Sequence, residues 1–185
     1  RKYGLRDGVC PMTRTVDHSF CVIGIDPGIA DLGYGIIRSE HDREPQYVDS
    51  GIVKTSAEQS DPLRVAKIQS AIRSLIAKYH PDFIVVEKYV GKPFQAVRVG
   101  KVMGAIELLA VEYSIPIEYV AQSSWKAELC GGRATKGDIQ EVVREPFDVE
   151  IAKTRNHESD AIGIALAGYR LFCGGGIRHD ECETA

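Results

Sequence analysis

Two continuous apolar runs, each ending in an acidic residue, constrain the fold of this chain more than any other feature. The first is Phe20–Ile25, followed by Asp26 and a Pro-Gly turn, and the second is Phe83–Val86, followed by Glu87. Runs without polar alternation are typical of strands covered on both faces, as in a parallel sheet. A lone acid at a strand end is more often a turn-capping residue. Because ligands gather outside the carboxyl ends of such strands, neighbouring strands would bring both carboxylates to one surface point.

The remaining pattern predicts an α/β fold. Apolar runs at 33–38 and 47–53, joined by short links, predict an antiparallel meander with the first strand. A further strand is expected at 116–120, and helices are expected from 61 to about 79, near 94–113, 122–130 and 135–144, and near 158–172. This order of strands and helices indicates a mixed five-stranded sheet flanked by helices.

The first helix has a clear start and an apolar face. Asp61 is expected to cap it, with Pro62 at the first helical position. Arg64 is one of the basic residues that interleave with the apolar face. That face is expected to comprise Leu63, Ile68, Ile72, Leu75, Ile76 and Tyr79.

Composition places the chain among ordinary globular proteins. Its 185 residues are 44% hydrophobic and 26% charged, which suits one domain. We expect that domain at 19–173, an N-terminal extension or tag at 1–18 and a flexible tail at 174–185. No apolar stretch is long enough to span a membrane. The five cysteines form no ligand spacing, which favours free thiols in a reducing compartment.

A third acidic position lies at the start of the last helix. His157 and Asp160 are three residues apart and so share a helix face, although Asn156 or His157 could merely cap the helix. Asp160 faces a helix surface rich in alanine, where a partly buried carboxylate needs a partner such as a cation. Two carboxylates about 5 Å apart repel by roughly 3 kcal/mol at an effective dielectric near 20. Hard divalent cations relieve this repulsion, so metal-assisted attack on a phosphodiester is the expected chemistry.

Six segments, in order along residues 21–172, resemble the RuvC family of Holliday-junction resolvases. They are Ile25–Ile37, Ser50–Ser56, Pro81–Glu87, Gly100–Gly104, Gly132–Gln140 and Ser159–Leu166. The resemblance implies a ribonuclease-H-like fold, a homodimer, and paired symmetric nicking of four-way DNA junctions that depends on Mg²⁺, with Mn²⁺ as a substitute. A branch-migration helicase is a further expected partner. The expected location is the cytoplasm, associated with the nucleoid, for a bacterial or phage protein, and an organelle for a eukaryotic one.

The resemblance also implies the catalytic and metal-binding residues. By motif they are Asp26, Glu87 and Asp160, with His157 at a position that is usually Asp. His157 could ligate a metal or handle a proton. Glu158 is the adjacent alternative, although it would point off the face that His157 and Asp160 share.

Basic and aromatic residues near these acids are expected to contact DNA. The loop 88–94 is shorter than usual in the family, and the position of its aromatic wedge falls on Val90, with Tyr89 and Phe94 as alternatives. Tyr89 is equally well explained as a core residue. Trp125 occupies the place of a basic residue important in the family, one position before Lys126. The expected DNA-binding residues are Lys88, Tyr89, Lys92, Phe94, Arg98, Lys126, Arg133 and Lys136.

The net charge of −3 alone argues against a general polyanion binder, because such domains are usually basic. The total averages two populations: acids that would hold cations, and bases that would face phosphates and make binding sensitive to salt.

A nuclease acting on flaps or forks and a non-catalytic junction-binding module remain alternatives, although three carboxylates near DNA would be costly without metal. Actin-like ATPases and sugar kinases need two such domains, and 185 residues are too few. Gly131–Gly137 resembles a P-loop only superficially, since Gly137 stands where Ser or Thr should follow the lysine.

Overall fold

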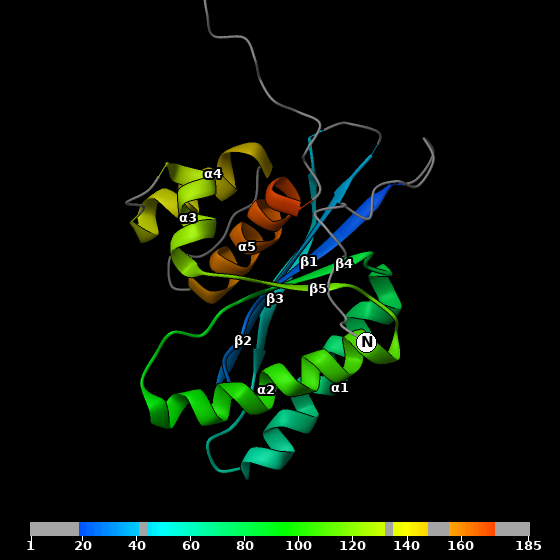
Figure 1. Ribbon diagram of the computed structural model, residues 1–185, viewed down its shortest axis with the longest axis vertical. Helices are drawn as coiled ribbons and strands as arrows, with labels where there is room; N and C mark the ends of the chain where they lie inside the picture. The colour runs from blue at the N-terminus through cyan, green and yellow to red at the C-terminus, as the bar shows by residue number, and fades with distance from the viewer. Residues whose placement is uncertain (1–18, 41–43, 132–134, 148–155, 173–185) are drawn as a thin grey trace, which may run out of the picture.

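The computed structural model describes residues 19–40, 44–131, 135–147 and 156–172, and these form a mixed sheet covered by helices on both faces (Figure 1). The strands are β1 (Phe20–Asp26), β2 (Asp31–Ser39), β3 (Gln46–Lys54), β4 (Phe83–Glu87) and β5 (Ile117–Val120). The helices are α1 (Asp61–Tyr79), α2 (Pro93–Glu112), α3 (Gln122–Cys130), α4 (Lys136–Phe147) and α5 (Asn156–Phe172). Every predicted strand and helix is present, and the predicted fold class is confirmed.

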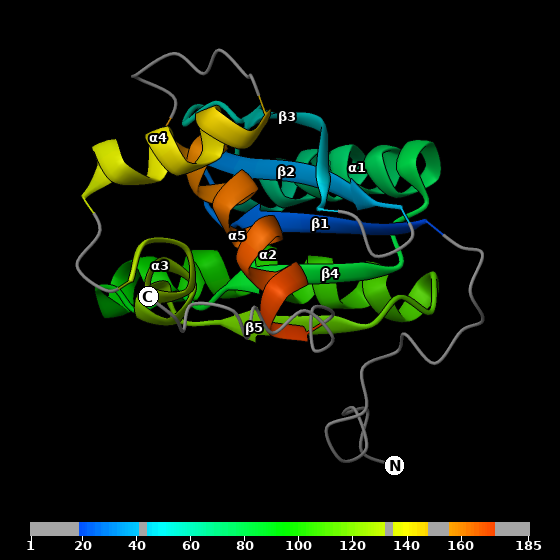
Figure 2. The ribbon, with the colours of Figure 1, turned by 90° about the horizontal axis from the view of Figure 1, so that it is seen from above.

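The sheet has the order β3-β2-β1-β4-β5, with the two apolar runs at its centre. β1 pairs antiparallel with β2, and β2 pairs antiparallel with β3, so the predicted meander is present; β1 also pairs parallel with β4. Helices α1 and α2 lie on one face, and α3, α4 and α5 lie on the other (Figures 1 and 2). Alternate residues of β1 therefore serve two cores: Ile23 and Ile25 pack toward α1 and α2, and Val22 packs toward α5.

Glycines let α5 lie directly on the backbones of β1 and β2. A Cβ atom at Gly24 would overlap the backbone carbonyl oxygen of Ala161, and one at Gly33 would overlap that of His157. Only a residue without a side chain allows this approach. The close packing holds the first turn of α5 over the carboxyl end of β1, and this fixes where the side chains of that turn can reach.

Two predictions for α1 are wrong. Ser60, not Asp61, occupies the N-cap, and the Asp61 carboxylate forms ion pairs with Arg98 and Lys101 of α2. Leu63 is 60% exposed, whereas Arg64 is only 4% exposed. The buried stripe follows the four-residue spacing of Arg64, Ile68, Ile72 and Ile76, so the long stem of Arg64 fills the place expected for a leucine.

Two further observations concern the described residues. Cys21 and Cys130 are free thiols. No helix in this part of the chain combines the length and the low polarity that crossing a membrane requires. The predicted extension at 1–18 and nearly all of the predicted tail lie outside the described residues, so the domain boundaries stay a prediction.

Candidate active site

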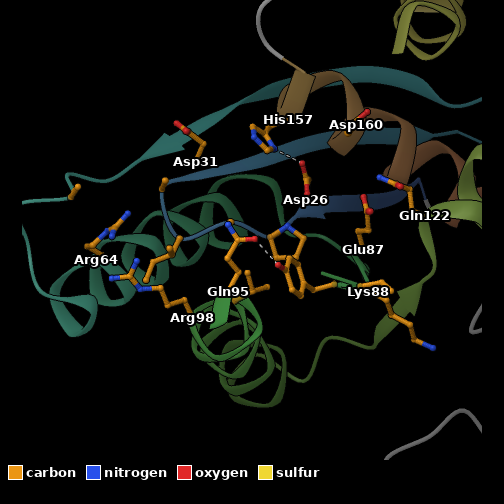
Figure 3. A pocket seen from close by; sticks show the side chains of 18 of the residues that line it. Asp26, Asp31, Arg64, Glu87, Lys88, Gln95, Arg98, Gln122, His157 and Asp160 are labelled. Carbon is orange, nitrogen blue, oxygen red and sulfur yellow. Dashed lines mark hydrogen bonds and ion pairs between the residues drawn. The ribbon is translucent and has the colours of Figure 1, made fainter. Parts of the chain in front are cut away.

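The two strand-end acids open into one cavity. In the parallel pairing of β1 and β4, Ile25 lies opposite Val86, so Asp26 and Glu87 leave the sheet at equivalent positions. Both line a cavity of about 650 Å³, which His157 and Asp160 of α5 also line. In Figure 3 the side chains of these four residues, all labelled, lie at one end of this pocket. The structure therefore brings together all four predicted catalytic residues.

Glu87 has a strongly perturbed carboxyl group. Burial raises its pKa from 4.5 to about 7, and the negative charges of Asp26 and Asp160 act in the same direction. The indole N–H of Trp125 donates a hydrogen bond to Oε2 of Glu87 at 3.3 Å, which lowers the pKa and offsets part of this shift. A carboxyl group poised near neutrality in a pocket is typical of a functional site.

His157 and Asp26 form a close pair across the pocket. Nδ1 of His157 lies 2.6 Å from Oδ2 of Asp26. This hydrogen bond is the main reason that the pKa of His157 is raised above its ordinary 6.5, so the pair favours the imidazolium. With Nδ1 protonated, the ring donates to the carboxylate and orients it. Oδ1 of Asp26 is left for another ligand.

The side chains at this end of the pocket carry the donor atoms that a hard divalent cation prefers, but they are not yet close enough together to bind one. Within the described ranges, no three His, Cys, Asp or Glu side chains are already gathered closely enough to hold a metal ion. The pocket is lined by four carboxylates, those of Asp26, Asp31, Glu87 and Asp160, and by the imidazole of His157. Mg²⁺ and Mn²⁺ prefer carboxylate oxygens, and mutual repulsion among the acids favours a cation between them. We conclude that these residues fit a divalent metal once their side chains converge.

Glu158 is excluded from this donor set. Its side chain is 6% exposed and does not line the pocket. Oε1 of Glu158 instead accepts a hydrogen bond of 2.7 Å from Oγ of Ser50 on β3. The prediction that Glu158 points off the shared face is confirmed, and its contact with β3 anchors the first turn of α5.

Half of the predicted DNA-binding residues lie at the pocket. Lys88, Tyr89, Arg98 and Lys126 line it. The hydroxyl of Tyr89 donates to Oε1 of Gln95 at 2.9 Å, which braces the loop before α2.

The other predicted contacts lie at or beyond its rim. Lys92 is exposed at the N-cap of α2. Phe94 is 77% exposed and Val90 is 89% exposed, so both side chains are open to solvent. Arg133 lies outside the described residues, and of Lys136 only its position at the start of α4 is described.

Several pocket residues escaped the sequence prediction. Asp31 of β2 lines the pocket and contributes to the raised pKa of His157. Arg64 of α1 and Gln122 of α3 line it as well. The four-residue spacing from Arg64 to Ile68 and Ile72 is a signal that could have identified Arg64 as an inward-facing residue.

Comparisons with known proteins show the family to which the chain is similar. Residues 22–168 match the family model described as crossover junction endodeoxyribonuclease RuvC. RuvC of Gloeobacter violaceus is 33% identical over 150 residues, covering 80% of this chain and 87% of that protein. RuvC of a Synechocystis species is also 33% identical, over 165 residues, covering 85% of this chain and 93% of that protein.

Solved structures show the same fold. RuvC of Thermus thermophilus in complex with a Holliday junction substrate superimposes with a TM-score of 0.75 at 28% identity, covering 84% of this chain and 94% of that one. The yeast mitochondrial Holliday junction resolvase gives a TM-score of 0.57 at 17% identity, with coverage of 86% and 87%, and shows the fold alone.

Proposed function

This chain belongs to the RuvC family of crossover junction endodeoxyribonucleases, and we propose that it resolves four-way DNA junctions at the pocket described above. One observation carries the assignment of the site. Acids from two parallel strands and the side chains of His157 and Asp160 from α5, distant in sequence, line one cavity. Burial raises the pKa of Glu87 there, and the charges of Asp26 and Asp160 add to the shift. The scissile phosphate would lie at this acidic end.

Each site residue has a distinct role in the proposal. Asp26, Glu87 and Asp160 hold the divalent metal on which the family depends; we take it to be Mg²⁺, with Mn²⁺ as a substitute. When bound, it supplies an activated water and neutralises charge that develops on the phosphate. His157 keeps a proton at Nδ1 and fixes the orientation of the Asp26 carboxylate through their 2.6 Å hydrogen bond.

The rim of the pocket would hold the DNA around the cut. Lys88 and Lys126 line the pocket near Glu87 and offer ammonium groups to backbone phosphates. The exposed ring of Phe94 is available to stack on an unpaired base at the junction centre. The helicase partner stays a prediction, since no described feature bears on it.

A homodimer would place two pockets on symmetric strands, and α2 offers the surface for it. Val97, Leu108 and Val111 are each about two-thirds exposed (65%, 65% and 66%). Together with Lys101 and Gly104 they follow heptad spacing, the pattern of a helix that packs against another helix. Leu108→Glu should convert the protein to a monomer in analytical ultracentrifugation. It should also replace paired nicks by single ones, and an unchanged dimer would contradict this choice of surface.

The test of the function is cleavage of a synthetic four-way junction labelled on each strand in turn. Wild-type protein with Mg²⁺ or Mn²⁺ should nick two opposing strands at symmetric positions. Asp26→Asn should bind the junction with unchanged affinity and cut at least about 10³-fold more slowly, whereas Glu58→Gln, a loss of an exposed acid outside the pocket, should have no effect.

Two results would redirect the proposal. Binding without cutting under both metals would leave a junction-binding module. Faster cutting of flaps or forks than of four-way junctions would assign the site to a related nuclease.

A further inference from the structure

Arg64 is a buried cation with no acidic partner in the described part of the chain. Its side chain is on the first turn of α1, and the residue is 4% exposed. Nε–H donates to Oγ1 of Thr55 at 2.8 Å, and none of the ion pairs among the described residues includes Arg64. A buried guanidinium without a counter-charge is costly. Arg64 lines the same pocket as the catalytic acids, so the pocket is where an anion could reach it.

The end of the pocket around Arg64 is positively charged. Figure 3 shows Arg64 and Arg98 at the end opposite to Glu87 and Asp160. Asp61 is the acid nearest to them by contact, and it already pairs with Arg98 at 3.1 Å and with Lys101 at 3.2 Å. Arg98 and Lys101 therefore share one carboxylate, and Arg64 adds a positive charge that has no ion pair among the described residues. The first turn of α2, which leads to Arg98, contains no acidic residue.

Arg64 is also held rigidly relative to the turn that follows Asp26. Oγ1 of Thr55, which accepts the hydrogen bond from Arg64, donates in turn to the backbone carbonyl of Ile29 at 2.5 Å. The backbone N–H of Thr55 donates to the carbonyl of Ala30 at 2.9 Å. A short chain of hydrogen bonds would thus fix the position of an anion bound at Arg64 relative to the turn after Asp26.

We propose that Arg64 and Arg98 form a phosphate-binding subsite of the pocket, which holds a backbone phosphate of the cut strand next to the scissile one. A guanidinium fork matches two phosphate oxygens, and it binds them more strongly when it is already desolvated and fixed, as Arg64 is. The subsite would set which phosphate reaches the acidic end. The identity of the ligand as a DNA strand rests on the proposed function, whereas the anion site itself does not.

The test pairs neutral phosphates with protein variants. Junctions carry a single methylphosphonate at each position flanking the cut, and single-turnover cleavage and binding are measured. With wild-type protein, the methylphosphonate at one position should slow cleavage by about 10-fold or more, as expected for a lost charge-assisted hydrogen bond. With Arg64→Gln, the methylphosphonate at that same position should no longer slow cleavage further, while the effects of methylphosphonates at the other positions should be unchanged.

A matched variant controls for loss of charge alone. Lys67→Gln removes an exposed cation from the same helix outside the pocket and should leave the wild-type pattern intact. If Arg64→Gln lowers activity uniformly and the position-specific effect persists, Arg64 only braces Thr55 and the subsite is refuted.

Two safeguards keep the outcome decisive. If Arg64→Gln does not fold, as judged by circular dichroism, Arg98→Gln replaces it, since the side chain of Arg98 is 41% exposed. Arg98→Gln must then reduce the effect of the methylphosphonate at the same position, or the subsite is refuted. If wild-type protein does not cut junctions, the binding measurements with the same DNAs still report on Arg64. Cleavage without coupling between Arg64 and one phosphate would retain the function and reject the subsite.

Discussion

Glu87→Gln should make the metal-free protein more stable relative to wild type as the pH rises. In the folded chain the pKa of Glu87 is raised from 4.5 to about 7, first by burial and then by the charge of Asp26. Below pH 4.5 the group is protonated in both folded and unfolded chains and contributes nothing. Between pH 4.5 and 7 the unfolded chain loses the proton first, which favours unfolding, and above pH 7 the full penalty persists.

The size of the effect follows from the shift. A change from 4.5 to about 7 is about 2.5 pKa units, which corresponds to an upper limit of about 3.4 kcal/mol at about 1.36 kcal/mol per unit. Since Glu87 is only partly buried, solvent screens the interaction, and we expect about 1–2 kcal/mol between pH 5 and pH 8. Glutamine keeps an oxygen that can accept the hydrogen bond from Trp125, so the substitution removes the charge with little change in packing.

The assay is urea unfolding of both proteins at pH 5 and pH 8 with a chelator present. The free energy of unfolding of Glu87→Gln, relative to wild type, should increase by about 1–2 kcal/mol from pH 5 to pH 8. Mg²⁺ at pH 8 should then stabilise wild type more than the variant. A difference that stays constant with pH, or that falls, would refute the electrostatic coupling assigned to this pocket.

Three other predictions concern the same site. Metal binding at pH 7 should release protons from Glu87 and His157, because both pKa values are raised, and the release should fall as the pH rises; calorimetry in buffers of different ionisation enthalpy counts these protons. Gly24→Ala should lower stability by about 1–3 kcal/mol and slow cleavage, because its Cβ would push α5 off the sheet; thermal unfolding and single-turnover rates check this. Trp125→Phe removes the donor that lowers the pKa of Glu87, so the acidic limb of the pH–rate profile should move to higher pH, and an unmoved limb would contradict the assigned role of the indole.

The fold could be predicted because its strands are marked locally. Phe20–Ile25 and Phe83–Val86 are apolar throughout, since each strand contacts helices on both faces of the sheet. The acids that follow them are expected to meet if the two strands are neighbours, because parallel neighbours end at the same edge. These features depend only on neighbours along the chain and on general sheet geometry.

Contacts between distant elements could not be predicted in the same way. Asp61 has the sequence of a helix cap, yet it pairs with Arg98 across the contact between α1 and α2. Arg64 and Leu63 are adjacent, and periodicity alone assigned the apolar one to the core. The hydrogen bond from His157 to Asp26 depends on how closely α5 approaches β1 and β2, which glycines on the two strands permit.

We propose that Asp26, Glu87 and Asp160 hold the metal of this enzyme and that His157 orients Asp26. Anomalous diffraction from crystals of the protein soaked in Mn²⁺ tests this directly. We expect an anomalous peak in the pocket within about 2.0–2.3 Å of carboxylate oxygens of Asp26 and Glu87, and its loss in Asp26→Asn crystals. A peak elsewhere on the protein, or the same peak in the Asp26→Asn variant, would contradict it.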